Sequence, residues 1–302
     1  MTLQRIVVGV DGSENSVAAV GWTAGLAAAT GAEVVAVHAL GLLDHLDSDE
    51  AVPSQPHREE IRQRFEGDWC ASLARPDVRC RHLVRDGAPV NVLLAVADEE
   101  DADLIVVGSR GLGPVASAFR GSVSAHLVDH AGCPVLVARS PDATRMLLAT
   151  DGTESSLRIP RLLAGWGTAF RGLPVEILSV ATRDAFVTPW GAGYEADGAL
   201  EPDLDVHERI AERVADEMME LGWHAAAVAV AGDPGREIVA AERDCGADLV
   251  VTGSRGLSTL RRLIAGSVAH DVLLHARSSV LVMRGQMPRR VLQRAAAFAA
   301  PA

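Results

Sequence analysis

Two stretches of the chain carry glycine, serine and arginine at a spacing that suits the binding of phosphate groups. The first reads ADLIVVGSRG at 102–111 and the second ADLVVTGSRG at 247–256, and in each a Gly-Ser pair follows after nine further residues. Glycine lets the backbone approach a ligand closely and adopt positive φ angles. A serine at a helix start adds its hydroxyl to free N–H groups that attract anions. The pattern therefore predicts two phosphate-binding loops.

The residues of this pattern are Gly108, Gly111, Gly121 and Ser122 in the first half, and Gly253, Gly256, Gly266 and Ser267 in the second. The alternative is that the glycines only make tight turns between strand and helix. A turn, however, does not need to keep the same nine-residue interval twice. The repeat therefore favours a ligand over a simple turn.

Four charged residues accompany the glycines. Arg110 and Arg255 lie inside the loops, where they can pair with phosphate, although solvated loop arginines are equally compatible with the sequence. Asp11 and Asp151 follow the first apolar run of each half, in VGVDGS and LATDGT. Either carboxylate can serve the ligand or cap the helix that follows.

Short apolar runs alternate with helical stretches and must position these residues. The runs cover 5–10, 33–40, 78–84, 103–108 and 134–139, then 145–150, 175–182, 225–232, 248–253 and 279–284. Because parallel neighbours need a helical crossover, this alternation predicts α/β domains with doubly wound parallel sheets. Each glycine loop follows a fourth strand, at the carboxyl edge of a sheet where ligands bind.

The repeat divides the chain into a nucleotide-binding domain over 1–141, a second over 142–285 and a tail over 286–302. Pro160 falls inside the first expected helix of the second half, so this helix should start late or kink. The tail belongs to neither repeat, and its arginine and alanine content suits a short surface helix or a disordered end.

Composition excludes several classes of function. The formal charge is -12, and no basic window with interleaved aromatics is present, which disfavours nucleic-acid binding. All 28 basic residues are arginine, so Schiff-base chemistry and a P-loop lysine are excluded. Aliphatic residues must fill the core, because aromatics are only 4% of the chain.

Metal-binding and membrane patterns are weak. The 4 cysteines form no CxxC pair, which fits a reducing cytoplasm, and no apolar segment is long enough for a signal peptide or a membrane span. His126 and His130 share a spacing that can bind zinc, but the second half does not repeat it, so surface histidines are favoured. We therefore expect a cytoplasmic protein without a dedicated metal site.

Together the motif G-x2-G-x9-G-[ST], the aspartates, the GAP and GDP turns and the ending HAGCPVLV resemble the ATP-binding universal stress protein family in tandem form. The resemblance covers about residues 3 to 284. It implies the strand order 3-2-1-4-5 in each Rossmann-like half, with the halves packed about a pseudo-twofold axis. It also implies ATP, with Mg²⁺, as the ligand.

Carried over by position, the resemblance implies cofactor-binding roles in two sets. The first set is Asp11, Ala39, Gly108, Arg110, Gly111, Gly121, Ser122, Val123 and Ser124; the second is Asp151, Val180, Gly253, Arg255, Gly256, Gly266, Ser267 and Val268. Ala39 and Val180 would offer backbone groups to adenine. Ala269 replaces the hydroxyl of Ser124 in the second half, which would weaken the second site.

The implied function is that of a nucleotide-dependent sensor or regulator in stress response, growth arrest or dormancy, without catalytic residues. Association into a homodimer and an unknown regulatory protein partner are expected. One alternative is a slow ATPase or an adenylyl-transferring enzyme, although lysine and a paired nucleophile and base are missing. A nucleotide-independent interaction module is a further alternative.

Overall fold

The computed structural model describes residues 2–41, 55–109, 122–182, 203–254 and 267–284. The strands of the first half are β1 (Arg5–Gly9), β2 (Glu33–Leu40), β3 (Arg79–Asp86), β4 (Leu104–Gly108) and β5 (Val135–Ala138). Those of the second half are β6 (Met146–Thr150), β7 (Pro174–Ala181), β8 (His224–Ala231), β9 (Leu249–Gly253) and β10 (Ser279–Met283). Each strand coincides with an apolar run of the sequence to within two residues.

All described strands form one sheet in the order β3-β2-β1-β4-β5-β10-β9-β6-β7-β8. Counted within each half, this is the expected order 3-2-1-4-5. The halves do not form separate sheets, because β5 of the first half pairs with β10 of the second. This pair is antiparallel, whereas every other described pair is parallel. The fold is therefore α/β with a mixed, mostly parallel sheet.

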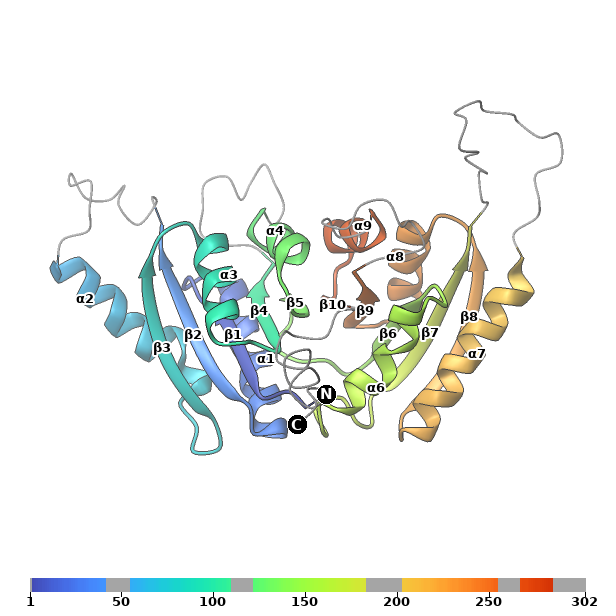
Figure 1. Ribbon diagram of the computed structural model, residues 1–302, viewed down its shortest axis with the longest axis horizontal. Helices are drawn as coiled ribbons and strands as arrows, with labels where there is room; N and C mark the ends of the chain where they lie inside the picture. The colour runs from blue at the N-terminus through green and yellow to red at the C-terminus, as the bar shows by residue number, and fades with distance from the viewer. Residues whose placement is uncertain (1, 42–54, 110–121, 183–202, 255–266, 285–302) are drawn as a thin grey trace, which may run out of the picture.

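Helices cover both faces of this sheet. The first half has α1 (Glu14–Thr30), α2 (Gln55–Arg64), a π-helical turn (Phe65–Trp69), a 3₁₀ turn (Ala71–Leu73), α3 (Pro89–Glu99) and α4 (Ser122–His130). The second half has α5 (Glu154–Leu157), α6 (Ile159–Ala164), α7 (Leu204–Glu220), α8 (Pro234–Cys245) and α9 (Ser267–His275). The sheet opens as a V, with α3, α4, α8 and α9 inside it and α2 and α7 along its outer sides (Figure 1).

Side-chain alternation along the strands builds two cores. Ile6 and Val8 of β1 face the core under α1 and α7, whereas Val7 faces the core under α3 and α4. Both cores run through both halves, and their strand residues are almost all Val, Leu, Ile and Ala, as a doubly covered parallel sheet requires. The low aromatic content is therefore a consequence of the architecture.

Pro160 divides the first helix of the second half. In the first half, α1 runs uninterrupted from Glu14 to Thr30. In the second half, α5 ends at Leu157, and α6 starts at Ile159 with the proline in its first turn. The expected interruption is confirmed, because proline cannot donate the backbone bond that would continue α5.

Reciprocal arginines join the two halves beside the β5–β10 pair. Arg139 donates to the carbonyl oxygen of Leu273 in α9 at 2.5 Å, and Arg284 donates to the carbonyl oxygen of Val128 in α4. Each arginine thus meets the carbonyl end of the other half's helix, where positive charge is favourable. Both pairs of residues are related by 145 positions, so these contacts repeat the pseudo-twofold symmetry.

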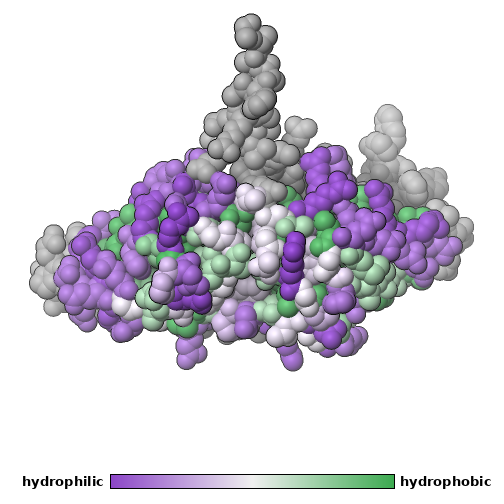
Figure 2. Space-filling model, turned by 90° about the horizontal axis from the view of Figure 1, so that it is seen from below, coloured by the Kyte–Doolittle hydropathy of each residue, from purple (hydrophilic) through white to green (hydrophobic). Residues whose placement is uncertain are grey.

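A groove with a largely small and apolar lining lies between the two halves. This groove of about 530 Å³ is lined by α1, the connecting segment and the second half; its lining includes Trp22, Pro141 and Phe170. Seen from below, pale and green residues occupy the middle of the molecule between hydrophilic flanks (Figure 2). No helix in the described ranges is long and apolar enough to cross a membrane.

The aspartate of the repeated phrase ties the first strand of each half to the fourth. Asp103 accepts from the backbone N–H groups of Gln4 and Arg5 at 2.8 and 2.9 Å. Asp248 accepts in the same way from Thr144 and Arg145, each at 2.9 Å through Oδ1. Part of the repeated phrase is therefore structural.

Replacing Asp248 with asparagine should destabilise the protein by about 1–2 kcal/mol at pH 7. Burial raises the pKa of Asp248, but hydrogen bonds from Thr144 and Arg145 outweigh it, so the net pKa is lowered. The stabilisation is complete above the unfolded-state pKa, near 3.9, and is lost as the pH falls through the lower folded-state pKa. In urea denaturation, the difference between wild type and variant should close on acidification. A gap that stayed constant to pH 3 would contradict this account; Asp244→Asn, at an exposed site, is the control.

The buried cysteines should react slowly with alkylating reagents. Burial raises the pKa of Cys70 and of Cys133 to about 12, so almost no thiolate is present at pH 8. We expect iodoacetamide at pH 8 to leave both thiols unmodified in the folded protein and to modify them in urea. Rapid labelling of Cys133 in the native protein, read by mass spectrometry, would contradict the described burial.

Candidate functional site

The candidate site lies where the fourth strand of each half ends and the next helix begins. Gly108 ends β4 and Gly253 ends β9, and Ser122 and Ser267 are the first residues of α4 and α9. The helix starts fit the sequence expectation closely. The loop residues Arg110, Gly111, Gly121, Arg255, Gly256 and Gly266 lie outside the described residues.

Gly108 has a packing role that the sequence did not indicate. A Cβ built on Gly108 would lie 2.6 Å from both the carbonyl carbon and the carbonyl oxygen of Asn15. The first turn of α1 therefore lies directly against the end of β4, and only glycine allows this approach. The sequence analysis interpreted Gly108 as a ligand contact, with a tight turn as the alternative, and the helix contact explains this glycine without a ligand.

The two aspartates shape the turn before the first helix of each half. Oδ1 of Asp11 accepts from the N–H and the hydroxyl of Ser13 at 3.0 and 2.6 Å, and Ser13 in turn caps α1. Asp151 holds Thr153 in the same way at 3.0 and 2.7 Å, and Thr153 caps α5. The hydroxyl residues thus do the capping, and the aspartates orient them.

Ala39 and Val180 lie near the carboxyl ends of equivalent strands. Ala39 of β2 pairs in register with Arg85, and Val180 of β7 pairs with Val230. The residues just before them differ. His38 is buried, with Nδ1 2.8 Å from the carbonyl oxygen of Val10, whereas the hydroxyl of Ser179 lies 2.8 Å from Nδ1 of His207.

The turns after the aspartates are covered differently in the two halves. Gly12 and Gly152 both have positive φ, at 78° and 72°. The indole of Trp69, from the π-helical turn, lies against Gly12, whereas the aliphatic side chain of Ile210 lies against Gly152. His38 is 5.2 Å from Trp69 between ring centroids, so among the described residues an aromatic cluster lies beside the turn of the first half. The Phe, Trp and His residues of the first half were the sequence feature from which this aromatic cluster could have been predicted.

Hydroxyl groups at the strand ends also differ between the halves. Ser109 donates to the side-chain oxygen of Asn15 at 3.1 Å. Its counterpart Ser254 is buried, and its hydroxyl has no hydrogen-bond partner among the described residues. In the helices, Ser124 of α4 is buried at the place where α9 has Ala269, while Val123 and Val268 are half-buried.

Metal ligands do not cluster in the described part of the chain. Within the described ranges, no group of three or more His, Cys, Asp or Glu residues could hold an ion. His126 and His130 stack with ring centroids 6.3 Å apart, and Nδ1 of His130 lies 2.9 Å from the carbonyl oxygen of His126.

Both halves match the protein-family model described as the universal stress protein family, over residues 2–139 and 143–284. Universal stress protein Rv2005c of Mycobacterium tuberculosis is 32% identical over 304 residues, covering 92% of this chain and 96% of that protein. A crystal structure of a universal stress protein from Archaeoglobus fulgidus is similar with a TM-score of 0.61 at 19% identity, covering 94% of this chain and 97% of that chain.

A universal stress protein solved in complex with cAMP is 31% identical, with a TM-score of 0.33, over 45% of this chain and 96% of that chain. Nucleotide binding is thus seen in a relative about half as long. The two family matches together span nearly the whole sequence, with one match for each half of the sheet. The chain therefore belongs to the universal stress protein family, in its tandem form.

Proposed function

We propose that the chain is a nucleotide-dependent sensor or regulator that binds ATP with Mg²⁺ in each half. It would act in the cytoplasm, in stress response, growth arrest or dormancy. The observation that carries the proposal is the repeated convergence of a strand end, an aspartate-held turn and a helix start at one edge of the sheet. This combination places backbone N–H groups and a positive helix end where phosphates would lie.

The described residues suit such a ligand. α4 begins at Ser122 and α9 at Ser267. The first turn of a helix directs backbone N–H groups outward, where they can donate to phosphate oxygens. The buried, unpartnered hydroxyl of Ser254 is a group that a polar ligand atom would satisfy. Asp11 and Asp151, held by their hydroxyl partners, present rigid carboxylates beside the same edge.

We infer that the two sites differ in strength. Ser124 offers a hydroxyl in α4, while Ala269 offers none in α9. A lost hydrogen bond to a charged group costs about 1.5–3 kcal/mol, which corresponds to more than a tenfold difference in affinity. The second half should therefore release nucleotide first as its concentration falls.

Binding rather than efficient catalysis is the proposed activity. The chain has no lysine to stabilise a phosphoryl group during its transfer. All of its basic residues are arginines, which suit the positioning of a bound ligand. Slow hydrolysis of bound ATP is compatible with the proposal. We further propose that the nucleotide state is read by a homodimeric assembly and by a regulatory protein partner.

Removing the Ser254 hydroxyl tests the ligand assignment directly. We expect Ser254→Ala to weaken Mg²⁺-ATP binding about tenfold at one of two sites, because roughly one hydrogen bond to the ligand is lost. The melting temperature without ATP should not fall, because the hydroxyl has no described protein partner. Isothermal titration calorimetry and thermal unfolding measure the two quantities.

Ser278→Ala is the matched control, since its hydroxyl is also buried and without a described partner but lies just before β10, which begins at Ser279. It should leave both binding events unchanged. If Ser254→Ala bound ATP as tightly as wild type, the Ser254 hydroxyl would not contact the ligand.

Two results with the wild-type protein would favour the alternative functions. ATP consumption that required an added acceptor would favour an enzyme, and no ATP binding at all would favour an interaction module.

A further inference from the structure

The two outer edges of the ten-stranded sheet have opposite chemistry, although the strands that form them are equivalent. β3 forms one edge and β8 the other, each eight residues long. Their registers match, since Arg79 faces Glu33 across β3–β2 and His224 faces Pro174 across β8–β7. The two strands can therefore be compared position by position.

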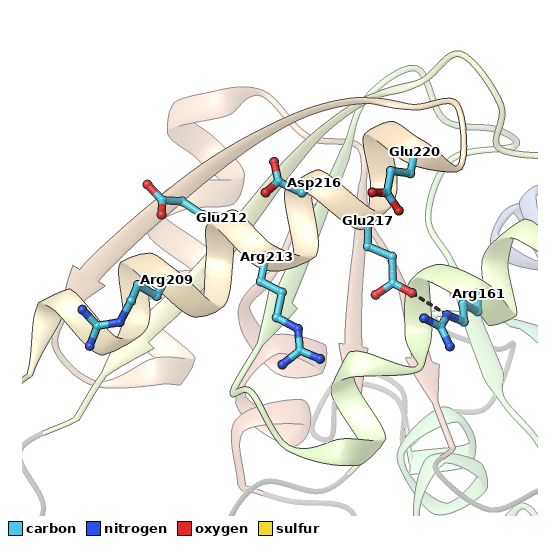
Figure 3. A pocket seen from close by; sticks show the side chains of 7 residues that line it. All are labelled: Arg161, Arg209, Glu212, Arg213, Asp216, Glu217 and Glu220. Atoms are coloured by element: carbon cyan, nitrogen blue, oxygen red, sulfur yellow. Dashed lines mark hydrogen bonds and ion pairs between the residues drawn. The ribbon is translucent and has the colours of Figure 1, made fainter.

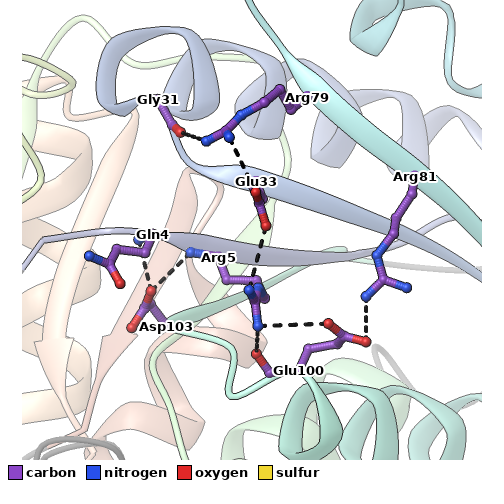
Figure 4. A network of polar contacts seen from close by, with 8 residues as sticks. All are labelled: Gln4, Arg5, Gly31, Glu33, Arg79, Arg81, Glu100 and Asp103. Carbon is purple, nitrogen blue, oxygen red and sulfur yellow. Dashed lines mark hydrogen bonds and ion pairs between the residues drawn. The ribbon is translucent and has the colours of Figure 1, made fainter.

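The β3 edge carries its own neutralising charges. Arg79 contacts Glu33 at 3.2 Å, Arg85 contacts Glu99 at 2.6 Å, and Arg81 contacts Glu100. Figure 4 shows Arg79 and Arg81 reaching from β3 toward the carboxylates of Glu33 and Glu100. Charged side chains on an edge strand oppose pairing with another chain.

The β8 edge lacks these arginines. At the positions of Arg79, Arg81 and Arg85, the second half has His224, Ala226 and Val230. Ala226, Ala227 and Val228 are exposed, Val228 by 36%. In the described part of the chain β8 pairs only with β7, so its outer backbone groups are available to a further strand. An exposed apolar edge of this kind is a template for strand addition.

Carboxylates surround this apolar edge on both faces. Glu176 of β7 pairs in register with Ala226, and burial raises the pKa of Glu176. On the outer face, Glu212 and Asp216 of α7 point to the side of the helix along which β8 runs (Figure 3). Arg213 points to the other side, as does Glu217, which binds Arg161 at 2.6 Å.

We propose that β8 is a docking site for an extended, basic segment of a partner protein, which adds a strand to the sheet. Alternating small apolar residues of that segment would cover Ala226 and Val228. Because successive residues of a strand point to opposite faces, its arginine or lysine residues would lie on the face covered by α7, where they would neutralise Glu212 and Asp216. A second β8 fits poorly, because two copies of α7 would bring like charges together.

The probe is a fluorescein-labelled eight-residue peptide that alternates arginine and valine, measured by fluorescence anisotropy against the full chain. Ala226→Arg supplies the missing edge charge and should weaken binding about tenfold. Gln63→Arg adds the same charge on exposed α2 and should change binding less than twofold. The double variant Glu212→Gln, Asp216→Asn should weaken binding about fivefold, while Glu60→Gln, Glu66→Gln should not.

Hydrogen exchange locates the bound peptide. Strand addition should slow amide exchange within residues 224–231 and leave residues 79–86 unchanged. If the test and control variants lost peptide affinity equally, the interaction would be non-specific charge attraction, and the proposal would be overturned. Self-association that Ala226→Arg abolishes would assign the edge to a second copy, which also overturns it. Neither result depends on nucleotide binding.

Discussion

Replacing Gly256 with valine should reduce the ATP retained through purification from two molecules per chain to one. Gly256 is the second glycine of the repeated pattern in the second half. A valine side chain would occupy space that the backbone needs for its approach to phosphate. Gly111→Val should do the same in the first half, and the double variant should retain no nucleotide.

The control is Gly132→Val, because a Cβ at Gly132 meets no atom within 4 Å and its φ is not positive. This variant should keep both nucleotides. Released nucleotide is counted by chromatography after heat denaturation. Unchanged stoichiometry in the double variant would refute the assignment of the glycine loops to phosphate binding.

Replacing Gly108 with alanine should destabilise the fold by about 3 kcal/mol, the upper range for overpacking in a closely packed core. The new Cβ would lie 2.6 Å from backbone atoms of Asn15, which cannot rotate away as a side chain could. The first turn of α1 must then shift away from β4. The urea midpoint should fall without a change in the slope of the transition.

Gly25→Ala is the matched control for this variant. Gly25 lies inside α1, and a Cβ there meets no atom within 4 Å. Alanine should therefore stabilise the helix by about 0.5–1 kcal/mol. A midpoint for Gly108→Ala equal to that of wild type would contradict the close packing of α1 against β4.

The order of elements was predictable from the sequence because parallel α/β folds obey strong local rules. Apolar runs such as 33–40 correspond to β2 residue for residue. The joining of the halves into one sheet was not predictable, since strand pairing between distant segments leaves no local pattern. Ser279 illustrates this point: it replaces a proline of the first half, and its hydroxyl lies 3.3 Å from the indole nitrogen of Trp22, 257 positions away.

The candidate site was predictable in part. The starts of α4 and α9 follow from the Gly-Ser pairs, and the turns at Asp11 and Asp151 follow from their spacing to hydroxyl residues. The packing role of Gly108 was not visible, because a glycine that contacts a ligand and one that contacts a helix look alike in a sequence. The sequence also did not predict that Trp69 covers the first turn and Ile210 the second. The two residues reach equivalent turns from helices of different shape, a π-helical turn and α7.

The central claim is that both halves bind ATP, and the most direct measurement counts nucleotide in the freshly purified wild-type protein. The protein is denatured by heat, and the released compounds are identified and quantified by chromatography. The account predicts close to two ATP per chain, or one ATP with a second taken up when Mg²⁺-ATP is added. No released nucleotide, together with no uptake of added Mg²⁺-ATP, would contradict it.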